Sequence, residues 1–178
     1  MSELRTNRIV PRDGLPSGTF GGIVQVVQTV KQSEQTIDGT EADVISATIN
    51  LKHASSKVMV CWSIAYGRGD DDYGYLKLFD GSSEVTAAHG NTASGNIINA
   101  LASISNRGAG EDGYFVNVMS GTYIHTPSST SPTIKIKGKC TYGSNIFINR
   151  MANNNDTTYN IRPASFLHLF ELADNINN

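Results

Sequence analysis

The side chains best suited to chemistry in this sequence are an acidic run, a pair of carboxylates on a predicted hairpin, and four histidines. The acidic run, residues 70–72, follows a glycine-rich turn, and carboxylate oxygens are ligands that Ca²⁺ prefers. Calcium-binding loops place their ligands at alternate positions, so only Asp70 and Asp72 are metal candidates. A contiguous run is more typical of a solvated acidic loop, and we predict no metal ion and no other cofactor.

Hydrolytic chemistry has little support in the sequence. Cleavage of a glycosidic bond needs two carboxylates about 5–10 Å apart. Asp80 and Glu84 are compatible with that requirement, but nothing in their spacing singles them out. The sequence contains no nucleophile elbow, no phosphate-binding loop and no zinc-binding helix motif. We therefore predict no catalytic residues and no enzymatic activity.

The four histidines are widely separated, and none has a partner at the short spacings of metal-binding pairs. They are His53, His89, His125 and His168. We interpret them as ordinary loop or strand residues. His168 has a second interpretation, because a strand histidine that faces its symmetry copies on an oligomer axis could sense pH or bind an ion.

The composition is that of a β-rich protein with many turns. The chain has 178 residues, of which 17 are glycine and only 17% are charged. A net charge of −2 provides no electrostatic attraction for nucleic acid, and no apolar run approaches the ~18 residues of a membrane span. The polar N-terminus has no signal-peptide core, so we expect Cys61 and Cys140 to be buried free thiols rather than a disulfide.

The hydrophobic patterning predicts about nine short strands separated by turn signals. The expected strands are residues 23–30, 44–51, 58–64, 73–79, 83–88, 114–119, 133–140, 145–150 and 164–172. Residues 31–43 and 126–132 are typical of loops, and residues 96–105 fit either a short helix or an irregular strand. This pattern predicts an all-β fold, an antiparallel β-sandwich of the jelly-roll type, over residues 23–178. Residues 1–22 are expected to form an extended N-terminal arm, because Pro11 and Pro16 restrict their neighbours.

Two of the predicted strands, residues 58–64 and 164–172, are apolar on both faces. One sandwich core can cover only one face of each strand, so we predict that another copy of the chain covers the second face, as in obligate homo-oligomers. The predicted interface residues are Val58, Val60, Trp62, Phe166, His168 and Phe170. The strand 133–140 differs, because its lysines at every second position indicate a solvated face or a protected edge.

Two segments at the start of the chain resemble a known module. Residues 4–18 (LRTNRIVPRDGLPSG) and 21–29 (GGIVQVVQT) are similar to the opening of the C-terminal β-rich domains of tail-fibre and other small virion proteins in tailed bacteriophages, especially marine ones. The resemblance continues through residues 49–60, 76–85, 145–150 and 164–172. The strand order and the closing apolar strand also look like the trimeric jelly rolls of tumour necrosis factor and the complement globular head, in which the last strand packs near the three-fold axis.

This resemblance implies a structural protein of a phage virion that assembles as a homotrimer. It also implies that the arm, through Arg8, Ile9, Val10 and Pro11, docks onto other virion proteins. We expect a tail-fibre or tail-associated adhesin that contributes to host attachment by contacting a surface glycan or protein. Two alternatives stay open: a capsid decoration protein on the phage head and a small carbohydrate-binding domain. None of these functions involves nucleic acid or insertion into a membrane.

Overall fold

The structure is a computed structural model of the chain, and it describes residues 22–69, 72–91, 97–104, 112–143, 145–155 and 160–173. The described strands are β1 (Ile23–Lys31), β2 (Gln35–Ile37), β3 (Ala42–Thr48), β4 (Lys57–Arg68), β5 (Tyr73–Asp80), β6 (Ser83–Glu84), β7 (Ala102–Ile104), β8 (Asn117–His125), β9 (Thr133–Tyr142), β10 (Ile146–Ile148) and β11 (Ser165–Leu172). Two 3₁₀ turns, η1 (Thr86–Ala88) and η2 (Asp112–Tyr114), accompany them. No helix in these ranges is long and apolar enough to cross a membrane.

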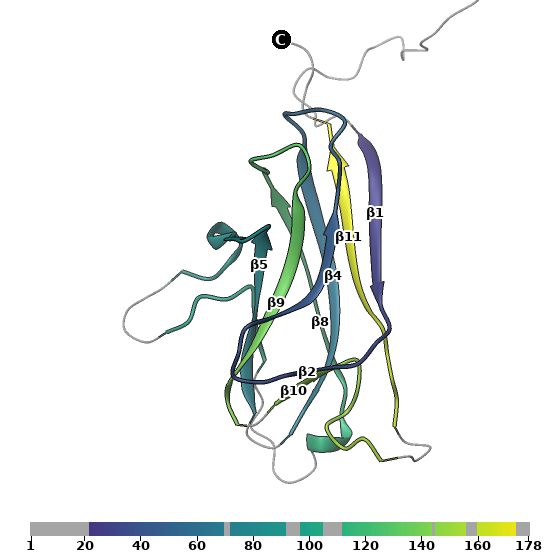
Figure 1. Cartoon of the computed structure of the whole chain (residues 1–178), viewed down its shortest axis with the longest axis vertical. Helices are drawn as coiled ribbons and strands as arrows, with labels where there is room; N and C mark the ends of the chain where they lie inside the picture. Colours follow the sequence, from purple (N-terminus) through teal and green to yellow (C-terminus); the bar gives the residue numbers. More distant parts are fainter. Residues whose placement is uncertain are drawn as a thin grey trace, which may run out of the picture.

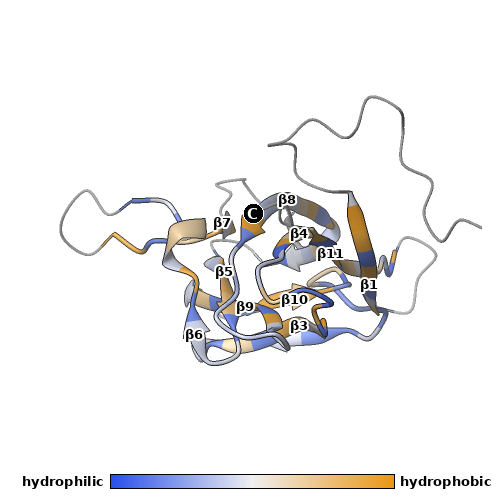
Figure 2. Cartoon of the chain, turned by 90° about the horizontal axis from the view of Figure 1, so that it is seen from above, coloured by the Kyte–Doolittle hydropathy of each residue, from blue (hydrophilic) through white to orange (hydrophobic). Residues whose placement is uncertain are grey.

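The strands form two antiparallel sheets that lie face to face (Figures 1 and 2). In sheet A the order is β1-β11-β4-β8. β11 pairs with residues 57–63 of β4, and the short strand β10 pairs with residues 66–68 at the other end of β4. β2 then pairs with β10. In sheet B the order is β3-β9-β5, and β5 then pairs with β7 near its start and with β6 at its end. The predicted antiparallel β-sandwich is confirmed, and the two-sided strands β4 and β11 lie side by side in the interior of sheet A.

Strand alternation places one face of each sheet in the core between them. Sheet A contributes Val58, Val60 and Ile64 from β4 and Leu167 and Leu169 from β11, all of them fully buried. Sheet B contributes the inward isoleucines of β9 and the leucines of β5: Ile134, Ile136, Leu76 and Leu78. Strand β9 lies between β3 and β5, so its outward lysines belong to a solvated face and not to a sheet edge.

Several local expectations differ from the structure. β2 lies in a segment predicted to be a loop. The prediction missed this strand because three residues are too few to show a strand pattern, and their ladder partner, β10, is distant in sequence. β8 begins at Asn117 rather than at residue 114, since residues 112–114 form η2. The predicted hairpin at Asp80-Gly81 is present, and Gly81 adopts a φ of +61°, but its second strand ends at Glu84. Of the predicted N-terminal arm, residues 1–21 lie outside the described residues.

A buried carboxylate joins the end of β11 to the loop that follows β3. Glu171 is fully buried and accepts hydrogen bonds from the backbone N–H groups of Lys52 and His53, at 2.8 and 3.1 Å. The side-chain amide of Gln25, on β1, also donates to this carboxylate. Burial by itself raises the pKa of Glu171, but the donors outweigh burial and lower the pKa below its usual value. One anion therefore connects β1, β11 and the 52–53 loop.

We expect Glu171→Gln to lower the free energy of unfolding by about 2–4 kcal/mol, because hydrogen bonds to a charged acceptor contribute about 1.5–3 kcal/mol and the amide replaces one acceptor by a donor. Since the folded-state pKa is lowered, this stabilisation is present above the unfolded-state pKa and is lost as pH falls through the folded-state pKa. Urea unfolding at neutral and acidic pH measures both effects.

The matched control is Glu34→Gln, since Glu34 is exposed and its ion pairs with Arg150 and Arg162 are 3.6 and 3.4 Å long. This control should cost less than about 1 kcal/mol. Equal losses for the two variants at neutral pH would contradict the role assigned to Glu171.

Candidate functional site

The outer face of sheet A carries apolar side chains across four strands, and we call this face the sheet A surface. The register of the strands aligns Val26 of β1, Phe170 of β11, Met59 of β4 and Ile124 of β8 in one row. The two adjoining rows are Gln28, His168, Cys61 and Thr122, and Val30, Phe166, Ser63 and Ser120. These three rows contain no aspartate, glutamate, lysine or arginine.

Much of the sheet A surface is open to solvent in the single chain. The exposed fractions of Val26 and Ile124 are 52% and 49%, and that of Val118, further along β8, is 61%. Along β11, the His168 ring lies between Phe166 and Phe170, with its centroid 6.3 Å from each. Exposed apolar side chains that extend over several strands, here with uncharged polar side chains among them, are typical of interaction sites.

The outer face of sheet B is charged instead. Lys135 on β9 forms an ion pair with Asp43 on β3, with 2.9 Å between Nζ and Oδ2. Lys137 lies 3.7 Å from a carboxylate oxygen of Glu41 and 3.8 Å from one of Asp43. Exposed ion pairs contribute little to stability, but their presence indicates a face that is in contact with water. The two outer faces of the sandwich are therefore suited to different surroundings.

The predicted interface residues divide between the two faces of sheet A. Phe166, His168 and Phe170 all lie on the sheet A surface. Val58, Val60 and Trp62 lie on the opposite face of β4 and are at most 6% exposed.

This placement corrects the sequence-based assignment for β4. Val58, Val60 and Trp62 are core residues of the subunit, because alternate residues of a strand point to opposite faces. The side chains that β4 contributes to the sheet A surface are those of Met59, Cys61 and Ser63, and no periodicity could distinguish the two faces of a strand that is apolar on both.

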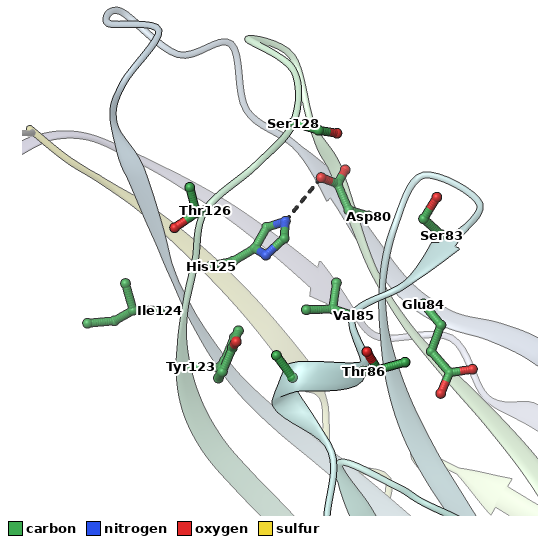
Figure 3. Close-up of a pocket in the computed structure, with 11 residues that line it drawn as sticks. Asp80, Ser83, Glu84, Val85, Thr86, Tyr123, Ile124, His125, Thr126 and Ser128 are labelled. Atoms are coloured by element: carbon green, nitrogen blue, oxygen red, sulfur yellow. Dashed lines mark hydrogen bonds and ion pairs between the residues drawn. The ribbon is translucent and has the colours of Figure 1, made fainter.

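A pocket with a volume of about 400 Å³ lies between the end of β8 and the β5–β6 hairpin (Figure 3). One side is formed by residues from Asp80 to Ala87, and the other by residues from Tyr123 to Ser128. The tight turn at Gly81 returns β6 alongside the end of β5, so that Ser83 lies opposite Asp80 in the ladder. The pocket thus depends on the contact between the two sheets and not on either sheet alone.

A hydrogen bond between the two sheets lies at this pocket. His125 Nε2 on β8 lies 3.1 Å from Asp80 Oδ2 on β5, and the exposed fractions of the two side chains are 13% and 14%. Figure 3 shows the two groups pointing toward one another. Within the described ranges, no hydrogen bond is made by His125 Nδ1 or by Asp80 Oδ1. The pocket therefore offers a carboxylate oxygen and an imidazole nitrogen, both held in position.

The second carboxylate of the pocket is engaged elsewhere. Glu84 lies 2.9 Å from Lys77 Nζ and 3.0 Å from His89 Nδ1. His89 Nε2 accepts the backbone N–H of Leu78, so Nδ1 carries the proton that is donated to Glu84. Burial by itself raises the pKa of Glu84, but Lys77 and His89 outweigh burial and lower the pKa. This network holds the hairpin on β5.

Of the two predicted metal candidates, Asp70 and Asp72, the structure describes only Asp72. Asp72 is buried, and its Oδ2 accepts the backbone N–H of Gly69 at 2.9 Å, an interaction that closes the turn before β5. Asp70 lies outside the described residues. Among the residues that the structure describes, no three His, Cys, Asp or Glu side chains are grouped as a metal site would require.

The remaining predicted residues are the docking arm and the two thiols. Arg8, Ile9, Val10 and Pro11 of the arm lie outside the described part of the chain. Cys61 and Cys140 are both free. Cys140 is buried as predicted, whereas Cys61 is only half-buried because it projects from the sheet A surface.

No protein-family model and no curated protein matches the sequence. Among solved structures, a chain of the "Structure of infectious bursal disease virus Gx strain" is similar over 96% of this chain, with 10% sequence identity and a TM-score of 0.41. This chain spans 42% of the length of that viral chain.

Hydrolysis of a glycan by Asp80 and Glu84 is not expected. A general acid needs a raised pKa, whereas the pKa of Glu84 is lowered. Incubation with bacterial surface polysaccharide should release no reducing ends above the buffer control. Sustained release that is lost in both Asp80→Asn and Glu84→Gln would contradict this expectation and assign the pair a catalytic role.

Proposed function

We propose that this protein is a structural component of a bacteriophage virion, a tail-fibre or tail-associated adhesin that assembles as a homotrimer through the sheet A surface. The N-terminal arm attaches the trimer to other virion proteins. The parts of the sandwich outside the sheet A surface remain free for host contact. The protein acts by binding, without a catalytic site or a cofactor.

The observation that carries the proposal is the contrast between the two outer faces of the sandwich. The sheet A surface presents Val26, Phe170 and Met59 in one row, whereas the sheet B face presents lysines paired with carboxylates. We expect another copy of the chain to pack against the sheet A surface, because obligate homo-oligomer interfaces are apolar and resemble a protein core. The resemblance to phage virion proteins and to trimeric jelly rolls supports a three-fold arrangement, with the last strand near the axis.

The energetic argument favours stable association. Fully burying an exposed side chain the size of Phe or Val contributes about 1.5–3 kcal/mol, and β11 offers Phe166 and Phe170, which are half-buried in the single chain and so contribute less than this each. Several such side chains per subunit can exceed the cost of lost rotational and translational freedom, which is about 4–15 kcal/mol. The interface therefore needs contributions from β1, β4 and β8 as well as from β11.

The substitution Phe170→Asp should dissociate the assembly. A charge at this position would be desolvated in each subunit and would approach its own copies, so that like charges repel in a site of low dielectric constant. Sedimentation velocity over a concentration series reads the change from trimer to monomer.

The control is Ser46→Asp, which places the same charge on the exposed outer face of sheet B, opposite Lys135. This variant should sediment as the wild type does. A wild-type protein that is monomeric at micromolar concentration would refute the assembly, and a stable dimer would refute the three-fold symmetry.

The location of the protein in the phage particle is tested by labelling purified phage with a gold-conjugated antibody raised against the protein. The proposal expects label on the tail. Label on the head shell would refute the adhesin and favour the alternative of a capsid decoration protein. Intact particles that carry no label and contain no copy of the chain would refute the assignment to the virion.

A further inference from the structure

We propose that the pocket between the end of β8 and the β5–β6 hairpin binds a neutral sugar residue. This inference rests on the proposed attachment function for its biological context, because it names the chemical class of the host ligand. The volume of the pocket, about 400 Å³, lies within the range of about 300–1,000 Å³ found for small-molecule pockets.

The polar groups of the pocket match the hydroxyl groups of a sugar. Asp80 Oδ1 accepts hydrogen bonds, and His125 Nδ1 provides a second fixed polar atom beside it. The pairing of Asp80 with His125 immobilises both side chains before a ligand arrives, which lowers the entropic cost of binding. Hydroxyl groups of Ser83, Thr86 and Ser128 line the same space.

The apolar groups of the pocket match the carbon face of a sugar ring. Tyr123 and His125 line the pocket from β8, and Val85 lines it from the hairpin side (Figure 3). A ligand with one apolar face and a rim of hydroxyl groups fits a lining of this composition.

The charges of the lining select against acidic sugars. Among the residues that the structure describes, the carboxylates of Asp80 and Glu84 line the pocket, and no lysine or arginine does. Glu84 is already paired with Lys77, so the carboxylate of a uronic or sialic acid would be repelled mainly by Asp80, and a neutral sugar is the class that the site favours.

His89 shows why His125 is the histidine that faces a ligand. Both ring nitrogens of His89 are used, by Glu84 and by the backbone of Leu78, and its side chain is fully buried. His125 uses one nitrogen only and is partly exposed. The two histidines thus have different roles in the same region.

The test is a titration of the ¹⁵N-labelled full chain with neutral methyl glycosides of glucose, galactose, mannose and N-acetylglucosamine, and with a methyl glucuronide. At least one neutral glycoside should bind with a dissociation constant on the order of 1 mM, and its shifts should centre on the lining residues. The glucuronide should bind at least about tenfold more weakly.

Two variants and one control make the assignment specific. Asp80→Asn should weaken binding about tenfold or more, because it removes the charged acceptor. Ala87→Trp should abolish binding, since it fills the pocket from an exposed position and leaves the hydrogen bond between Asp80 and His125 intact. Asp43→Asn, the same chemical change on the outer face of sheet B, should leave binding unchanged.

Binding that survives Ala87→Trp, or the absence of shifts at concentrations about tenfold above 1 mM for every neutral glycoside, would overturn the inference. Sedimentation of the same samples separates this inference from the proposed function. A trimer that binds no glycoside refutes the sugar site alone, and a monomer that binds one refutes the assembly alone.

Discussion

The structure depends on β4 and β11, two neighbouring strands that are apolar on both faces. Their inward side chains, among them Val60 and Leu169, fill the core against sheet B. Their outward side chains, among them Met59 and Phe170, cannot reach that core, because alternate residues of a strand point to opposite faces. The same pairing that builds the sandwich therefore creates an apolar surface that the subunit cannot cover by itself, and this surface carries the proposal of self-assembly.

The remainder of the sandwich is organised for contact with water and ligands. Sheet B covers the core with β5 and β9 and presents ion pairs outward, and the Glu171 carboxylate fixes the loop at residues 52–53 to β1 and β11. The pocket at Asp80 and His125 lies where the two sheets meet. Assembly is assigned to the sheet A surface and ligand binding to this pocket, and the two adjoin at Ile124, which belongs to both.

The sequence predicted the fold class because the relevant signals are local: the alternation in β9, the turn at Gly81 and the β-branched residues of β1. It could not assign the faces of β4, since Val60 and Met59 are both apolar. It also missed the hydrogen bond between Asp80 and His125, which are 45 residues apart and meet only through the packing of two sheets. No spacing rule covers such a pair, whereas the acidic run at residues 70–72, which has an obvious pattern, contributes Asp72 to a turn.

Thiol accessibility of Cys61 tests the central claim most directly, because this residue lies in the middle row of the sheet A surface and Cys140 serves as a buried internal reference. The account predicts that Cys61 reacts slowly with a thiol reagent in the native wild-type protein and rapidly once Phe170→Asp has separated the subunits, while Cys140 stays unreactive in both. Reaction of Cys61 at the same fast rate in the wild type, at a concentration where the protein sediments as an oligomer, would contradict burial of this surface between copies.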